Sequence, residues 1–226
     1  MPAPELNAEW VKRSLSLPRF EPYVRTCEGD ETAAVRLYGW NVDVSAAFYS
    51  ALHCLEIVLR NALHDELKFH YARSNWWTAA QPAGEGANLI TDAYRRLNRT
   101  IGRAPNSDDV VAAMPFGFWV SLVSRSNEAA MWRPALYRAF RPGYRRSRRE
   151  MHVHLNSLRL FRNRVMHHEP IHTRHLEADR NRIYELAEYL APGAAAMLGR
   201  GNTLADALAR RPLSPNGERW HNRGRG

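Results

Sequence analysis

The segment RNRVMHHEP, residues 162–170, places an arginine, an asparagine and two adjacent histidines in a stretch with helical periodicity. A histidine titrates near neutral pH and can exchange a proton with a substrate within hydrogen-bond reach. An arginine offers a fixed fork of donors that suits phosphate oxygens and stabilises charge that develops on them. An asparagine can orient the imidazole or donate to the same oxygen. Arg162, Asn163 and His167 together fit phosphodiester cleavage without a metal ion, with an RNA 2′-hydroxyl as the nucleophile.

The position of Arg162 on its predicted helix is unusual, because it falls on the apolar stripe. A guanidinium is costly to bury there unless an anionic or hydrogen-bonding group meets it, so we expect Arg162 to border a cleft or an interface. Asn163 and His167 lie one turn apart on a neighbouring face. The spacing from arginine to histidine is weak evidence by itself, because about one such pair is expected by chance and Arg149 with His154 is another instance.

The basic residues are concentrated in one part of the chain. The net charge is +9, and Lys12 and Lys68 are the only lysines among the 32 basic residues. The segment from Arg125 to Arg174 has twelve arginines and three acidic residues, and so carries the whole excess. Such a concentration favours a polyanionic partner, because neutralising phosphates releases counterions. The predicted RNA-binding residues are Arg145, Arg146, Arg148, Arg149, Arg159 and Arg164. The alternative for the run RRSRR at 145–149 is a solvated turn before a helix.

Length and composition indicate a folded protein with one main domain. The chain has 226 residues, of which 45% are hydrophobic and 24% charged. We expect a single domain over residues 1–211 and a basic, flexible tail over residues 212–226. The sequence shows neither a secretory signal nor an apolar run long enough to span a membrane, so we expect a cytoplasmic protein. Cys27 and Cys54 have no metal-type spacing and are expected to be small buried side chains.

Apolar residues repeat at helical spacing along most of the chain, which predicts an all-α protein. Expected helices cover about 5–14, 17–27, 30–40, 43–72, 89–102, 107–114, 151–169 and 176–190. Residues 78–88 are expected to form a loop, and Ser107 is the predicted N-cap of its helix. Trp76 and Trp77 are expected to pack in the core or at an interface.

A second polar group lies on the long helix expected at 43–72. Glu56 and Arg60 are four residues apart with the acid first, which is the favourable order for a helical ion pair. One interpretation is a structural pair with Asn61 exposed. The other is that Glu56 and Arg60 face the same cleft as Arg162 and position Arg162 or the substrate.

Several stretches resemble the Abi-like (abortive infection) branch of the HEPN superfamily. The segment RNRVMHHEPI, preceded by LNSLRLF, is similar to the signature of that family, and YGWNVDVSAAFYSALHCLEIVLRNAL, PFGFWVSL and RIYELAEYLAP are similar to other parts of it in the same order. The resemblance covers about residues 16–195. It implies a HEPN-like helical bundle with additional N- and C-terminal helices, and a homodimer with a composite active site.

The same resemblance implies a function in phage defence, or as a toxin, for a metal-independent endoribonuclease without a cofactor. Arg162, Asn163 and His167 correspond to the HEPN catalytic motif, and His168 is an additional histidine of the Abi-like version. Glu56, Arg60 and Asn61 are secondary site candidates. The expected partners are RNA, a second copy of the chain, and an antitoxin or a phage-derived trigger; no membrane partner is expected.

Four other interpretations of the motif stay open. His167 and His168 could complement the dipole at a helix C-terminus. His168, His172 and His175 have spacings that a zinc ion could use. The protein could be a non-catalytic RNA- or protein-binding module, acting as an infection sensor or an antitoxin partner. The motif could also be the target of covalent modification by a partner enzyme.

Overall fold

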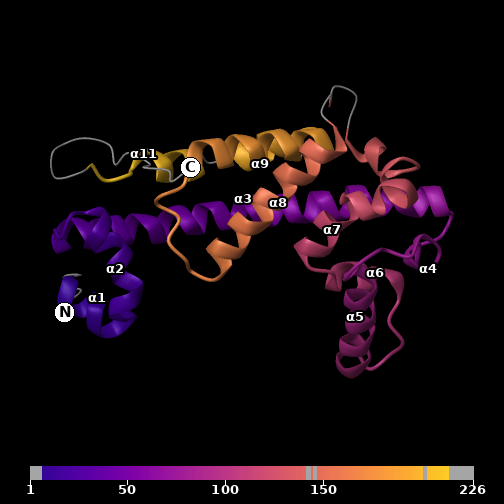
Figure 1. The fold of residues 1–226 in the computed structure, drawn as a ribbon, viewed down its shortest axis with the longest axis horizontal. Coiled ribbons are helices and arrows are strands. Elements are labelled where there is room, and N and C mark those ends of the chain that lie inside the picture. The colour runs from indigo at the N-terminus through magenta and orange to yellow at the C-terminus, as the bar shows by residue number, and fades with distance from the viewer. Residues whose placement is uncertain (1–6, 141–143, 145–146, 201–202, 214–226) are drawn as a thin grey trace. The chain divides into compact units, whose positions relative to one another are not determined.

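The computed structural model describes residues 7–140, 144, 147–200 and 203–213. These residues form helices and connecting turns, with no strand among them, which confirms the all-α prediction (Figure 1). Most of the predicted tail, residues 214–226, lies outside the described residues.

The α-helices are joined mostly by short connections, with one longer link before the helix that begins at Arg148. They are α1 (Ala8–Leu15), α2 (Leu17–Thr26), α3 (Glu31–Tyr71), α4 (Trp77–Ala80), α5 (Gly86–Thr100), α6 (Ser107–Ala113), α7 (Phe116–Leu122), α8 (Arg148–Met166), α9 (Leu176–Leu190), α10 (Ala194–Gly199) and α11 (Thr203–Ala209). Between α7 and α8 lie three short turns of 3₁₀ or π type, Arg125–Asn127, Glu128–Trp132 and Leu136–Ala139.

The contacts divide the chain into two compact units, each built from separated segments. Unit 1 comprises residues 1–51, 163–181 and 199–226, and unit 2 comprises residues 52–162 and 182–198. The helices α3, α8, α9 and, by its last residue, α10 therefore contribute residues to both units. The prediction of a single domain over residues 1–211 stays a prediction.

Helix α3 corrects the prediction of two separate helices at 30–40 and 43–72. It runs without a break through all 41 residues from Glu31 to Tyr71, with Gly39 in its interior. Its N-terminus is capped by Asp30, whose Oδ1 accepts a hydrogen bond from the backbone N–H of Ala33 at 2.9 Å. The two predicted helices were separated at Asn41 and Val42. Asn41 is instead buried, and its side chain accepts a hydrogen bond from the loop after α8, also in unit 1.

The core of unit 1 is built by α1, α2, the first half of α3 and the last helix. Its fully or nearly buried side chains include Val11, Phe20, Leu37, Trp40, Val44, Phe48, Ile171, Leu204 and Ala207. Trp40 Nε1 donates to the carbonyl of Ala207 at 2.7 Å, and the guanidinium of Arg211 lies 5.2 Å from the Trp40 ring centroid. These contacts attach α11 to the unit.

The core of unit 2 joins a leucine stripe to an aromatic cluster. The stripe on α3 comprises Leu52, Leu55, Leu59, Leu63 and Leu67, all almost fully buried. Trp76, Phe118 and Trp119 pack with ring centroids 5.1–6.5 Å apart. Trp76 and Trp77 are both buried, which confirms the packing role expected for them.

Two local predictions in unit 2 need correction. The loop predicted at 78–88 is shorter, because α4 extends to Ala80 and α5 begins at Gly86. A side chain at Gly86 would place its Cβ 2.8 Å from the Cβ of Pro82, so only glycine fits this approach. The N-cap of α6 is Asn106 and not Ser107: the Asn106 side chain and Asp109 form a reciprocal capping box.

The length and apolar character of α3 would allow it to cross a membrane, contrary to the sequence-based expectation that no such run exists. This is weak evidence, because the core helix of a soluble protein meets the same criterion. Of the apolar stretch that meets this criterion, 33% is buried among the described residues.

Candidate functional site

Arg162 lies in unit 2, on the last part of α8 that belongs to this unit. Its neighbours on the helix, Leu158 and Phe161, are fully buried, whereas the side chain of Arg162 is 29% exposed. The carboxylate of Glu56, itself 23% exposed, lies 3.4 Å from Arg162 Nε. An anionic group therefore meets the guanidinium on the apolar stripe, as its burial requires. The Nε atom is buried and the pair is too poorly aligned for a hydrogen bond.

Glu56 pairs with Arg162 of the motif and not with Arg60, its neighbour one turn along the helix. The Glu56 carboxylate faces α8 instead of forming the predicted helical pair with Arg60. Arg60 Nε donates to Asn61 Oδ1, its exposed neighbour, at 3.2 Å. Within the described part of the chain, Glu56 is thus the secondary candidate that pairs with a residue of the motif.

The remaining motif residues lie in unit 1, where α8 ends in a tight turn. The backbone N–H of His168 donates to Val165 O at 3.2 Å, and that of Glu169 donates to Arg164 O at 2.9 Å. This pattern is a Schellman motif, and its left-handed position is taken by His168 with φ 57°. Glycine usually fills that position because a side chain there is strained. His167 and His168 are both exposed.

The turn after α8 is fixed by partners from the N-terminal helices of unit 1. Arg19 Nη1, from α2, donates to the carbonyl of His168 at 2.8 Å. Asn41 Oδ1, from α3, accepts from the backbone N–H groups of Ile171 and His172 at 2.9 and 3.1 Å. Sequence reasoning missed Arg19 and Asn41. The sequence offered one indication that Asn41 has a structural role, namely a polar residue inside an apolar helical stripe.

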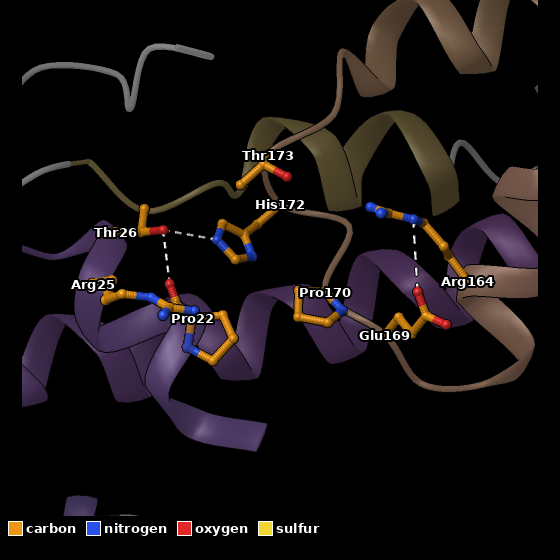
Figure 2. Close-up of a pocket in the computed structure, with 8 residues that line it drawn as sticks. All are labelled: Pro22, Arg25, Thr26, Arg164, Glu169, Pro170, His172 and Thr173. Carbon is orange, nitrogen blue, oxygen red and sulfur yellow. Dashed lines mark hydrogen bonds and ion pairs between the residues drawn. The ribbon is translucent and has the colours of Figure 1, made fainter. Parts of the chain in front are cut away.

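His172 is the most deeply buried histidine of this region, with 1% exposure. Its Nε2 lies 2.9 Å from the hydroxyl of Thr26, and its ring packs against Tyr23 at 4.7 Å between centroids. Burial, with a smaller contribution from nearby Arg211, lowers the pKa of His172 from 6.5 to about 4. The imidazole is therefore neutral at physiological pH and acts as a structural group. Figure 2 shows the ring directed at Thr26.

A polar cavity of about 640 Å³ lies beside His172, between α2 and the loop that follows the motif (Figure 2). The two arginines that line it already have acidic partners. Arg25 pairs with Glu21 at 3.3 Å, and Arg164 pairs with Glu169 at 3.7 Å. Both pairs are exposed, so each is weak in water.

The zinc interpretation finds no support in the geometry. Among the described residues, no three His, Cys, Asp or Glu side chains are grouped so that they could hold a metal ion. His172 is committed to Thr26, and His175 Nδ1 accepts from the backbone N–H of Ala178.

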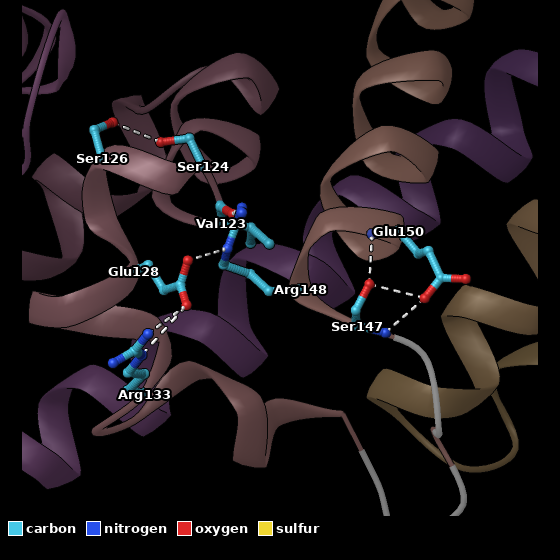
Figure 3. Close-up of polar contacts among 8 residues, drawn as sticks. All are labelled: Val123, Ser124, Ser126, Glu128, Arg133, Ser147, Arg148 and Glu150. Carbon is cyan, nitrogen blue, oxygen red and sulfur yellow. Dashed lines mark hydrogen bonds and ion pairs between the residues drawn. The ribbon is translucent and has the colours of Figure 1, made fainter.

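The basic segment contains arginines in very different situations. Arg148 is only 13% exposed; its Nε lies 3.0 Å from Glu128 and its Nη1 donates to Val123 O at 2.9 Å (Figure 3). Glu128 also binds Arg133, and these two guanidinium groups, that of Arg133 first, hold the pKa of Glu128 below its usual value. Arg148 is therefore a structural residue of unit 2.

The other predicted RNA-binding arginines divide by exposure. Arg149 is exposed, and Arg159 is half-buried with its Nε donating to Asn156 Oδ1 at 3.0 Å. Arg164 is exposed but pairs with Glu169. Arg145 and Arg146 lie outside the described residues.

The two cysteines are free and buried, which confirms the expectation for them. Burial raises the pKa of the Cys27 thiol to about 11 and also raises that of Cys54. Neither thiol is therefore suited to nucleophilic catalysis.

The chain matches no protein-family model, no curated protein and no solved structure. The resemblance to Abi-like HEPN proteins accordingly stays a prediction from the sequence.

Proposed function

We propose that the protein is a metal-independent endoribonuclease of the HEPN type, in which Arg162, Asn163 and His167 act on one RNA phosphodiester. In this reaction the 2′-hydroxyl loses its proton and its oxygen attacks the phosphorus atom. The bond from phosphorus to the 5′-oxygen breaks, and that oxygen takes up a proton. The products are a 2′,3′-cyclic phosphate and a 5′-hydroxyl end.

Each motif residue has a defined part in the proposed reaction. His167 exchanges a proton with the 2′-hydroxyl or the leaving 5′-oxygen, since an exposed imidazole can act as base or acid near neutral pH. Arg162 holds the scissile phosphate and stabilises its developing charge. Asn163 orients the histidine or the phosphate. In a homodimer, a second copy would supply a second imidazole, so that one takes the proton and the other returns it.

The observation that carries the proposal is the state of Arg162. Its guanidinium is on an apolar stripe, keeps partial exposure and is held by a poorly aligned ion pair with Glu56. Donors that this pair does not use remain available for a phosphate, and the Glu56 carboxylate limits where the guanidinium can lie. His167 is also exposed, so neither group is in a dry interior.

The test is cleavage of total RNA in excess EDTA, followed by mapping of the new ends. The wild type should produce cyclic phosphate and 5′-hydroxyl ends, and His167→Ala should reduce the rate by about 10²- to 10⁴-fold. His70→Ala, at an exposed histidine of α3, is the matched control and should cleave like the wild type. Full activity in His167→Ala, or strict dependence on magnesium, would rule out this mechanism. Salt-sensitive RNA binding without cleavage would indicate the non-catalytic module instead.

A further inference from the structure

Unit 1 contains a second, larger cavity of about 780 Å³ that the proposed chemistry does not use. Its lining comes from the end of α1, from α2, from the first half of α3 and from the turn that ends α8. The turn contributes Met166 and His168, which flank the proposed catalytic His167 in the sequence. A volume of this size is in the range of small-molecule pockets.

One wall of this cavity is an aromatic and aliphatic face of α3. Tyr38, Val42, Ser45 and Tyr49 follow one another at spacings of four, three and four, which places them on one side of the helix. Val42 is 50% exposed and Tyr49 is 48% exposed, although both are large apolar or aromatic residues. The wall therefore presents ring and methyl surface to solvent.

The charge of the lining is complementary to a polyanion. Arg19 and His168 are the only basic residues on the described lining, and no acidic residue belongs to it. Arg19 Nη1 donates to the carbonyl of His168, which holds this guanidinium at the border of the cavity. The polar cavity beside His172 includes Glu169, and a smaller cavity in unit 2 includes Glu85, so both suit an anion less well.

We propose that this cavity is the base-binding subsite of the ribonuclease, in which an unpaired RNA base stacks on Tyr49 while Arg19 faces the adjoining phosphate. The inference rests on the proposed function for the identity of the ligand. Single-stranded RNA is recognised by stacking of splayed bases on aromatic side chains, with arginine nearby. A cavity with tyrosines, apolar walls and basic groups has this chemistry. The turn at His168 links the subsite to the motif.

The experiment measures binding without cleavage. The probes are a single-stranded 2′-O-methyl oligonucleotide, which lacks the nucleophile, and an abasic phosphodiester chain of the same length and charge. The wild type should bind the base-bearing probe about tenfold more tightly than the abasic one, as expected for a stacked base. Tyr49→Ala should remove most of this preference, whereas Tyr49→Phe, which keeps the ring, should retain it. Thermal unfolding of each variant verifies that it folds.

Tyr137→Ala is the matched control, because Tyr137 is 50% exposed and lies outside this cavity in unit 2. Loss of the preference in Tyr137→Ala instead of Tyr49→Ala would overturn the proposal, and so would equal binding of the two probes by the wild type. RNA cleavage is measured separately. If Tyr49→Ala removes the base preference but His167→Ala does not change cleavage, the base-binding subsite is supported and the proposed nuclease is not. If His167→Ala abolishes cleavage but Tyr49→Ala leaves the base preference unchanged, the nuclease is supported and the proposed subsite is wrong.

Discussion

Two arginines of α8, both in unit 2, show how differently the same side chain can be used. Arg148 is 13% exposed and bonds both Glu128 and the carbonyl of Val123. Arg162 is 29% exposed, and its pair with Glu56 at 3.4 Å includes no hydrogen bond from the buried Nε. The first guanidinium contacts two groups of its own unit through Nε and Nη1. The second guanidinium is positioned by Glu56, but its Nε has no hydrogen-bond acceptor. A group that binds a ligand needs such unused donors.

The largest effect that separates the two arginines should be on catalysis. We expect Arg162→Ala to lower the rate of RNA cleavage in EDTA by about 10²- to 10³-fold, because a charge-stabilising donor is lost in the transition state. Its free energy of unfolding should change little, since the ion pair with Glu56 is partly exposed. Single-turnover cleavage and denaturant unfolding measure the two quantities. If Arg162→Ala lowers the free energy of unfolding so far that unfolding explains the lost cleavage, Arg162 would be a structural residue like Arg148.

A comparable effect, on stability, is expected for buried His172 in unit 1. The pKa of this group is about 4 in the folded state and near 6.5 when unfolded, so protonation favours the unfolded state. Its contribution is fully present above pH 6.5 and is lost as the pH falls towards 4. We expect the wild type to lose about 2–3 kcal/mol more than His172→Gln between pH 7 and pH 4.5. Urea unfolding at both pH values measures this difference, and parallel losses in the two proteins would contradict it.

A smaller effect on stability is expected at Arg148. Arg148→Ala should lower the free energy of unfolding by about 1–3 kcal/mol, because the carbonyl of Val123 and the Glu128 carboxylate lose a donor. The cleavage rate of the folded variant should stay near that of the wild type. A loss of RNA affinity at unchanged stability would instead assign Arg148 to the RNA-binding set.

The smallest effect is expected in the turn that ends α8. His168 has a left-handed backbone conformation, φ 57°, which costs a side-chain-bearing residue about 1 kcal/mol relative to glycine. We therefore expect His168→Gly to raise stability by up to about 1 kcal/mol, measured by urea unfolding. If His168 also serves the reaction, the more stable variant should be less active. Unchanged cleavage in His168→Gly would show that the His168 side chain has no part in the reaction.

The helical elements could largely be predicted from the sequence, because apolar periodicity depends on local spacing. The need for an anionic partner at Arg162 was also predictable from its place on an apolar stripe. The identity of that partner was not, since Glu56 could equally have formed the local pair with Arg60. Asn41 fell in the gap between the two helices predicted at 30–40 and 43–72. Its two hydrogen bonds go to a loop far along the chain. Long-range polar contacts leave no periodic signal.

The proposed function depends most on Arg162 and His167 acting at a single phosphodiester. A double-mutant cycle on the cleavage rate in EDTA tests this directly, with Arg162→Ala, His167→Ala and the combined variant. When two groups act in one transition state, removing both lowers the rate little more than removing one of them. We therefore expect the combined variant to cleave about as slowly as the slower single variant. Fully additive losses would show that the two residues act independently and would contradict the proposed site.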